Sequence, residues 1–169
     1  RYPFPVPYGW FQVSWAKDLA VGEARAAYHF GKHLVLWRDE EGTPHVQDAF
    51  CPHLGAHLGH GGCVKGESIQ CPFHAWRFGA DGKCVEVPYA KRIPQKACVR
   101  HHRVQEKNGL IFMWHCPRNS EPDWEIPTIE HYAKDGWTEW DAALLYIKTH
   151  PKEVVENLAD KAHFGPVHG

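Results

Sequence analysis

The sequence predicts a mainly β N-terminal domain, an antiparallel β-sandwich or partly open barrel, followed by the start of an α+β domain. Three observations support this fold class: many short β-rich runs separated by turn residues, a polar and proline-rich stretch from residue 117 to 127, and a strand-like run that leads into a helical one. We therefore expect one domain over residues 1–118. Residues 119–169 should be a linker and the first part of a second domain.

The first domain is predicted from hairpin patterns. Runs rich in β-branched and aromatic residues alternate with Gly, Asp and Asn, and the dipeptides Asp81-Gly82 and Asn108-Gly109 are typical of tight turns between antiparallel strands. The expected runs are Tyr28 to Arg38, His45 to Phe50, Ser68 to Pro72, Arg77 to Val87 and Cys98 to His115.

The second domain should open with a strand and a helix. Trp137 to Lys148 has the composition of a strand, and Pro151 can occupy the first turn of a helix that follows Thr149 or His150. Gly165-Pro166 should end that helix. Its expected apolar stripe is Val154, Val155, Leu158 and Ala162.

Composition excludes several functional classes. Hydrophobic residues make up 43% of the chain and there are eight tryptophans, enough for a folded core, while the formal net charge of −1 and the lack of a basic patch interleaved with aromatics argue against nucleic-acid binding. No run approaches the about 18 apolar residues of a membrane span, and the start has no secretory pattern. Four cysteines lie outside any paired spacing: Cys63, Cys84, Cys98 and Cys116. We expect their thiols to be reduced and buried, as is typical of a cytoplasmic protein.

Two short segments carry the most specific signal. Cys51-Pro-His53 and, after seventeen residues, Cys71-Pro-Phe-His74 supply two thiolates and two imidazoles, which is the ligand set of a Rieske [2Fe–2S] cluster. In such a cluster two cysteines hold one iron and two histidines hold the other. We therefore predict a one-electron carrier at these four residues.

Other interpretations of these segments remain open. Structural zinc also binds two cysteines and two histidines, although zinc modules usually pair like with like, and the residues could be uninvolved in metal binding. His57 and His60 lie in the same first segment and are rival ligands. The Cys-x-His spacing favours His53.

A second constellation lies near the C-terminal end. Asn157, Asp160, His163 and His168 fall within twelve residues, and two histidines with one carboxylate hold iron in non-haem Fe(II) oxygenases. Asp160 precedes His163 by one helical turn and could accept a hydrogen bond from an imidazole. Taken alone the pattern is weak, because solvated or helix-capping histidines give the same spacing.

The two cluster segments, CPHLGAHLGHGG and CPFHAWRFGADGKC, resemble the Rieske domain of ring-hydroxylating and steroid-hydroxylating non-haem iron oxygenases. With YPFPVPYGWFQV near the start, the chain is most similar to the 3-ketosteroid 9α-hydroxylase and cholesterol 7-desaturase group. The resemblance covers essentially the whole chain. It implies the terminal oxygenase component of an O2-dependent monooxygenase with a helix-grip-like catalytic domain and a hydrophobic, steroid-like substrate. It also implies a homotrimer that receives NAD(P)H electrons only indirectly, through a reductase or ferredoxin.

The resemblance assigns roles to individual residues. It implies that His163 and His168 hold a mononuclear Fe(II), and that Asp160 bridges a Rieske histidine of one subunit to the iron site of the next. The third iron ligand of the family is a distant carboxylate, so we expect this chain to be part of a longer protein. Ala56, Phe73 and Trp76 stand where high-potential Rieske proteins carry a disulfide and a serine. The midpoint potential should therefore lie nearer about −150 mV than about +300 mV.

Two rival functions remain at the level of the sequence. One is a Rieske ferredoxin that only carries electrons, and the other is an oxygenase that acts on an aromatic ring. The ferredoxin would need no residues beyond about His115, so the segment with His163 and His168 favours an oxygenase.

Overall fold

A computed structural model describes residues 6–138, 140–143 and 145–169. The chain forms two compact units. One is Pro7–Tyr132, and the other comprises Ala133–Gly169 together with Val6. None of the described helices has the length and apolar composition needed to span a bilayer.

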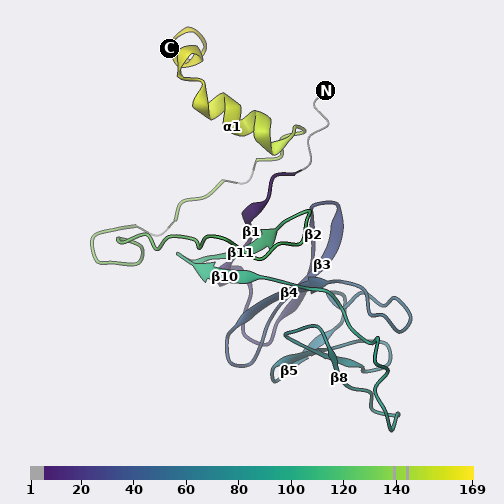
Figure 1. The fold of residues 1–169 in the computed structure, drawn as a ribbon. Helices are drawn as coiled ribbons and strands as arrows, with labels where there is room; N and C mark the ends of the chain where they lie inside the picture. The colour runs from purple at the N-terminus through teal and green to yellow at the C-terminus, as the bar shows by residue number, and fades with distance from the viewer. Residues whose placement is uncertain (1–5, 139, 144) are drawn as a thin grey trace. The chain divides into compact units, whose positions relative to one another are not determined.

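The larger unit consists of three antiparallel sheets (Figure 1). The first has the order β1 (Gly9–Trp15), β11 (Leu110–His115) and β10 (Val104–Lys107), and a short 3-10 helix, Ala16–Asp18, follows β1. The second is β2 (Ala24–His29), β3 (Lys32–Arg38), β4 (Pro44–Asp48) and β9 (His101–His102). The third is β5 (Cys63–Lys65), β6 (Ser68–Gln70), β7 (Arg77–Gly79) and β8 (Cys84–Glu86). The predicted mainly β, antiparallel class is confirmed.

Strand β3 lies at the centre because both of its faces are apolar. Leu34 and Leu36 are buried in one core with residues of β1 and β11, whereas Val35 and Trp37 are buried in another with residues of the third sheet. Side chains alternate between the faces of a strand, so the continuous apolar run LVLW fits only a strand covered on both sides. The second core lies directly beneath the two cluster segments.

The two turn dipeptides do lie in hairpins, but some strands begin or end at other residues than predicted. Gly82 and Gly109 have left-handed φ angles of 78° and 74° in the turns before β8 and β11. The expected run Tyr28 to Arg38 was wrong in one respect: it crosses a turn at Phe30 and Gly31, both with positive φ, and so joins the end of β2 to β3. Strands β1 and β5 were not anticipated. The burial of the four scattered cysteines was also wrong for most of them, because only Cys84 is buried.

The smaller unit contains α1 (Pro151–Ala159), whose first turn has Pro151 and whose N-cap is His150, as the sequence indicated. The helix ends earlier than predicted. Asp160, with φ −76° and ψ 88°, leaves helical geometry, and its carboxylate accepts a hydrogen bond from the Ala162 amide at 3.0 Å. A 3-10 turn, Lys161–His163, and a π-helical turn, Phe164–His168, follow.

The strand predicted over Trp137 to Lys148 is wrong for the described residues, none of which is in a strand. Leu145, Tyr146 and Ile147 have the right composition but are exposed. A strand is stable only when its backbone groups pair with a neighbour and one face is covered, and composition does not report whether such a neighbour is present.

Candidate functional site

The two cluster segments form the same hydrogen-bonded turn. In the first, the Cys51 amide donates to the Ala56 carbonyl at 2.9 Å and the Gly55 amide donates to the Cys51 carbonyl at 2.9 Å. The second repeats both bonds at equivalent positions. The Cys71 amide donates to the Trp76 carbonyl at 2.8 Å and the Ala75 amide to the Cys71 carbonyl at 3.1 Å.

The backbone conformation repeats as well. Gly55 and Ala75 occupy the same position in the two turns and have φ angles of +76° and +57°. An alanine in this left-handed region is strained by about 1–2 kcal/mol, so the surrounding structure must hold the second turn in place. Strands β6 and β7 do so, because they flank this turn directly and pair with each other.

The four predicted ligands lie together at these turns. Cys51 and Cys71 are buried and close enough for their thiols to interact, and the imidazole rings of His53 and His74 are 4.5 Å apart between centroids. The Nδ1 atom of His53 is buried without a hydrogen-bond partner, as expected of an imidazole nitrogen reserved for a metal.

Electrostatics at the thiols also fit metal binding. The pKa of the Cys51 thiol is raised to about 11, mainly by burial and in part by the neighbouring Cys71, although the backbone amides of His53 and Leu54 lower it. A thiolate there therefore needs a positive metal ion for full stabilisation. The two backbone amides are already oriented toward the sulfur atom that would carry negative charge.

In the described part of the chain, no three or more His, Cys, Asp or Glu side chains surround a single ion position. A [2Fe–2S] cluster takes two protein ligands per iron, so its four ligands need not converge on one point. Structural zinc requires four ligands around one centre. The two turns, each with one cysteine and one histidine, offer the ligand types of a [2Fe–2S] cluster.

Aromatic side chains pack against the histidines. The Trp76 ring stacks on the His53 ring with centroids 4.5 Å apart and planes at 8°. The Trp76 indole Nε1 donates to the Tyr89 hydroxyl at 2.6 Å, and the Tyr89 ring lies 6.5 Å from that of His74. Tyr89 was not predicted from the sequence, because it lies fifteen positions after His74 and no local spacing connects the two.

The C-terminal constellation is only partly assembled. The rings of His163 and His168 lie 5.4 Å apart between centroids, and Asp160 Oδ2 lies 3.4 Å from His163 Nδ1. Both ring nitrogens of His163 are buried without a hydrogen bond, which fits a metal ligand. Asn157 is exposed on α1.

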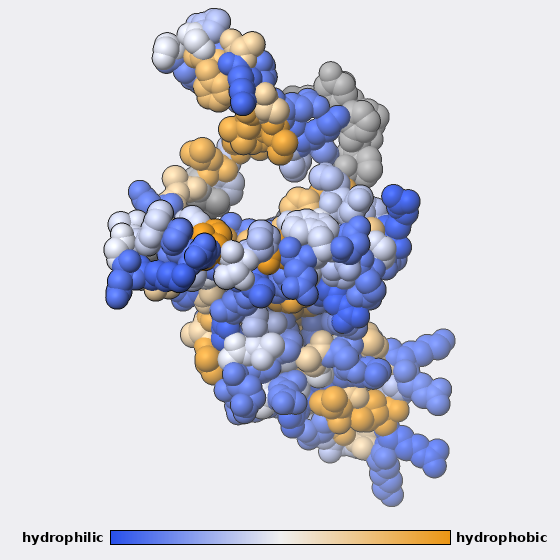
Figure 2. Space-filling view, turned by 60° about the vertical axis from the view of Figure 1, so that its left-hand side comes forward, coloured by the Kyte–Doolittle hydropathy of each residue, from blue (hydrophilic) through white to orange (hydrophobic). Residues whose placement is uncertain are grey.

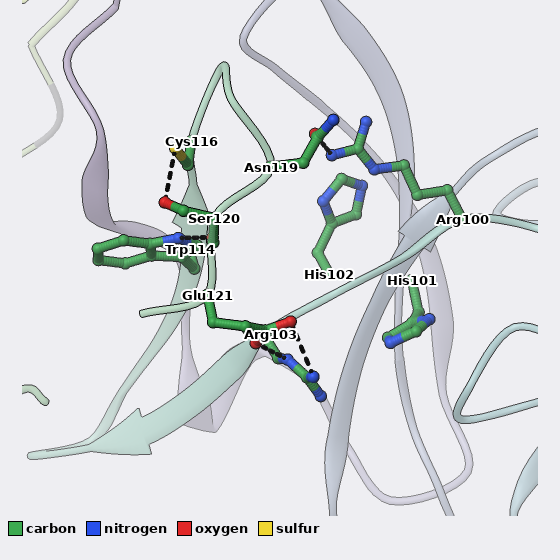
Figure 3. A pocket seen from close by; sticks show the side chains of 9 residues that line it. All are labelled: Arg100, His101, His102, Arg103, Trp114, Cys116, Asn119, Ser120 and Glu121. Carbon is green, nitrogen blue, oxygen red and sulfur yellow. Dashed lines mark hydrogen bonds and ion pairs between the residues drawn. The ribbon is translucent and has the colours of Figure 1, made fainter. Parts of the chain in front are cut away.

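A groove of about 400 Å³ is lined by residues that belong to neither constellation (Figure 3). Both of its arginines form hydrogen bonds within the groove. Arg103 donates two to the Glu121 carboxylate, at 2.6 and 3.1 Å, and Arg100 donates one to the Asn119 side chain at 2.5 Å. The Cys116 sulfur lies 3.1 Å from the Ser120 hydroxyl, an interaction that lowers the pKa of this thiol. These contacts join Asn119 and Glu121 to Arg100 and Arg103, on either side of β9.

Comparison with known families agrees with the turn geometry. A family model described as "Rieske [2Fe-2S] domain" matches residues 9–107, which contain both turns. This chain belongs to the Rieske family. The family binds a [2Fe–2S] cluster, and the residues at the two turns fit that group. A second model, "3-Ketosteroid 9alpha-hydroxylase C-terminal domain", matches residues 113–169.

Individual relatives include a steroid oxygenase component and a sterol desaturase. A 3-ketosteroid-9-alpha-monooxygenase oxygenase component of Rhodococcus rhodochrous is 42% identical over 163 residues, covering 95% of this chain and 43% of the relative. Cholesterol 7-desaturase nvd of Xenopus laevis is 39% identical over 163 residues, covering 96% of this chain and 36% of the relative. The chain thus spans about two-fifths of the length of the curated relatives it matches.

Solved Rieske structures share the fold. Dicamba monooxygenase with non-heme iron and dicamba matches with a TM-score of 0.66 and 26% identity, over 75% of this chain and 38% of that one. The terminal oxygenase of carbazole 1,9a-dioxygenase from Novosphingobium matches with a TM-score of 0.60 and 25% identity, over 67% and 31%. Both are named as oxygenases.

Proposed function

We propose that this chain belongs to the terminal oxygenase component of a Rieske non-haem iron oxygenase. Cys51, His53, Cys71 and His74 would hold the [2Fe–2S] cluster. His163 and His168 would hold a mononuclear Fe(II), with a third, carboxylate ligand supplied from outside this chain. The single observation that carries the proposal is the presence of two ligand sets on one chain: two matching Cys/His turns and a separate pair of neighbouring imidazoles, His163 and His168.

The protein residues would position and tune these groups. When bound, the cluster supplies single electrons and the iron supplies dioxygen activation. Trp76 fixes the ring plane of His53 by stacking on it, and the amides of His53 and Leu54 point at the Cys51 sulfur. Asp160 would orient His163, since carboxylates next to metal-bound imidazoles set the ring orientation and tautomer.

The names of the relatives support a substrate class and a partner. Names such as 3-ketosteroid-9-alpha-monooxygenase and cholesterol 7-desaturase support a steroid or sterol-like substrate. The words "oxygenase component" support a separate reductase that carries NAD(P)H electrons to the cluster. We further propose a homotrimer, a functional boundary between residues 118 and 119, and a cytoplasmic location, which the six unpaired cysteines support.

The first experiment is to measure iron and acid-labile sulfide in anaerobically purified full-length protein, with an EPR spectrum after dithionite reduction. Three irons and two sulfides per chain, with a Rieske signal, are expected. Two irons and two sulfides would favour an electron carrier, and zinc without sulfide would exclude the Rieske centre. A redox titration of the same sample should give a midpoint nearer about −150 mV than about +300 mV.

The role of Asp160 is tested by Asp160→Asn in the full-length enzyme. Both metals should remain bound, while the rate of cluster oxidation during single turnover with steroid and O2 should fall about 10- to 100-fold. Glu156→Gln removes the same charge one turn earlier in α1 and should leave the rate unchanged. Equal rates in Asp160→Asn and the unmodified enzyme would refute the role.

A further inference from the structure

Tyr89 follows β8 and lies outside the two cluster turns, yet its hydroxyl contacts a residue of the second turn. It accepts the 2.6 Å hydrogen bond from the Trp76 indole Nε1. A tight turn holds Tyr89 in this position, because the Ala90 amide donates to the Val87 carbonyl at 3.1 Å and Pro88 occupies the second position, where proline favours such turns. Val87 is buried, so the turn is anchored in the core that lies beneath the cluster turns.

Burial of the tyrosine ring does not account for its placement. Tyr89 is 62% exposed, and Figure 2 shows exposed apolar side chains at the lower end of the molecule, the end at which Figure 1 draws β5 and β8. Trp76, in contrast, is only 7% exposed. A buried indole N–H requires an acceptor, and the Tyr89 hydroxyl supplies it. The hydroxyl group is therefore the part of Tyr89 that the cluster region uses.

The hydrogen bond fixes the part of Trp76 that its backbone does not. The Trp76 carbonyl accepts from the Cys71 amide, which restrains only the main chain. The indole stacks on the His53 ring, with planes at 8°. Stacking restrains the plane of a ring but lets two parallel rings slide past each other, whereas an N–H···O bond is directional. The stack and the hydrogen bond together define the position of the indole.

The two cluster imidazoles depend on such ring contacts. Imidazoles that bind a metal are usually oriented by a hydrogen bond to their other nitrogen. Within the part of this chain that the structure describes, neither His53 nor His74 has a side-chain hydrogen bond, and aromatic rings contact both. Tyr89 is linked to each of them. It reaches His53 through Trp76, and its own ring lies edge-on to that of His74, at 6.5 Å and 73°.

We propose that Tyr89 is a positioning residue for the [2Fe–2S] cluster: its hydroxyl holds the Trp76 indole in the place that sets the orientation of the His53 ring. The inference rests on the proposed function. Without the hydroxyl, the buried indole N–H loses its acceptor, which is unfavourable. The indole should then turn toward another acceptor, and the His53 ring that stacks on it should turn as well. The orientation of a ligand ring affects the affinity of the site for its metal and the potential of the cluster.

The test is Tyr89→Phe in the full-length holoenzyme, because this change keeps the ring beside His74 and removes only the oxygen that accepts from Trp76. Iron and sulfide content should be unchanged. We expect the g values of the reduced EPR spectrum and the midpoint potential to shift, and the rate at which an iron chelator bleaches the cluster to rise about tenfold. The matched control is Tyr28→Phe, which removes the hydroxyl of a tyrosine that is also 62% exposed and should change none of these quantities.

Trp76→Phe tests whether Tyr89 acts through the indole. Phenylalanine can stack on His53 but has no N–H group, so adding Tyr89→Phe to this variant should cause no further change. Tyr89→Phe alone decides the outcome if Trp76→Phe does not assemble the cluster.

Several results would overturn the positioning role while leaving the oxygenase assignment intact. One is a set of g values and a bleaching rate in Tyr89→Phe equal to those of the unmodified enzyme, and another is an equal effect of Tyr89→Phe with and without Trp76→Phe. A shift that accompanies dissociation of the enzyme in sedimentation would make Tyr89 a subunit contact and also overturn the role. Absence of a Rieske EPR signal in the unmodified enzyme would instead overturn the proposed function.

Discussion

The two cluster turns and the C-terminal histidine segment differ in how the backbone holds their side chains. The turn at Cys71 lies between paired strands β6 and β7, repeats the hydrogen bonds of the turn at Cys51, and rests on a buried core. His163 and His168 lie in a 3-10 turn and a π-helical turn after a helix that buries none of its residues. The cluster turns are thus held by paired strands and a buried core, whereas the histidine segment is held within this chain by the helix that precedes it.

The largest effect should come from a thiolate ligand. Cys51→Ser should abolish the cluster, because the buried turn then offers a hydroxyl in place of a soft sulfur ligand. Acid-labile sulfide and the reduced EPR spectrum measure the loss. Cys63→Ser changes an exposed cysteine on β5 and should keep both signals. A full complement of sulfide in Cys51→Ser would show that the two turns are not the cluster site.

The next effect concerns the C-terminal histidine segment. His163→Ala in the full-length protein should remove the mononuclear iron and lower turnover at least about 100-fold, while the Rieske EPR signal stays unchanged. His150→Ala, which removes the side chain that accepts from the Lys152 amide, should weaken α1 by about 1 kcal/mol and retain the iron. Parallel loss of both metals in His163→Ala would mean that the two regions do not act as separate sites.

Two glycines near the cluster turns, Gly59 and Gly66, should differ in how much stability an alanine costs. A Cβ at Gly59 would lie 2.6 Å from the Ala26 backbone nitrogen on β2, so Gly59→Ala must push the first turn away from the sheet. We expect a loss of about 3 kcal/mol in the free energy of unfolding. Gly66 has φ +58° and open space, so Gly66→Ala should lose only about 1 kcal/mol. Urea unfolding followed by the visible circular dichroism of the cluster measures both, and equal losses would contradict the close packing.

The smallest effect is electrostatic. His102 Nε2 and Asp48 Oδ1, 2.9 Å apart, join β9 to β4, and this hydrogen bond lowers the pKa of Asp48. A lowered folded-state pKa contributes stability above the ordinary value of about 3.9, and that stability is lost as the pH falls through the folded-state pKa. Because Asp48 is partly exposed, Asp48→Asn should cost only about 0.5–1 kcal/mol near neutral pH and nothing in strong acid.

Thermal unfolding of the holoenzyme at several pH values would show the Asp48 effect as a difference that shrinks on acidification. Glu67→Gln, at an exposed position, is the control and should give no difference. A difference that grows in acid would have the wrong sign for an ionised Asp48.

The sequence by itself determined the ligand spacing, the antiparallel class, the turns at Gly82 and Gly109 and the start of α1 at Pro151, because each depends on residues close together in the chain. Only the tertiary structure decided that β3 is covered on both faces, that Ala75 adopts the conformation of Gly55, and that Tyr89 reaches Trp76. Asp160 ended α1 early because its carboxylate accepts from the nearby Ala162 amide, whereas the described residues of 137–148 are in no strand. Local patterns record what a segment can form, whereas pairing and burial depend on partners distant in the sequence.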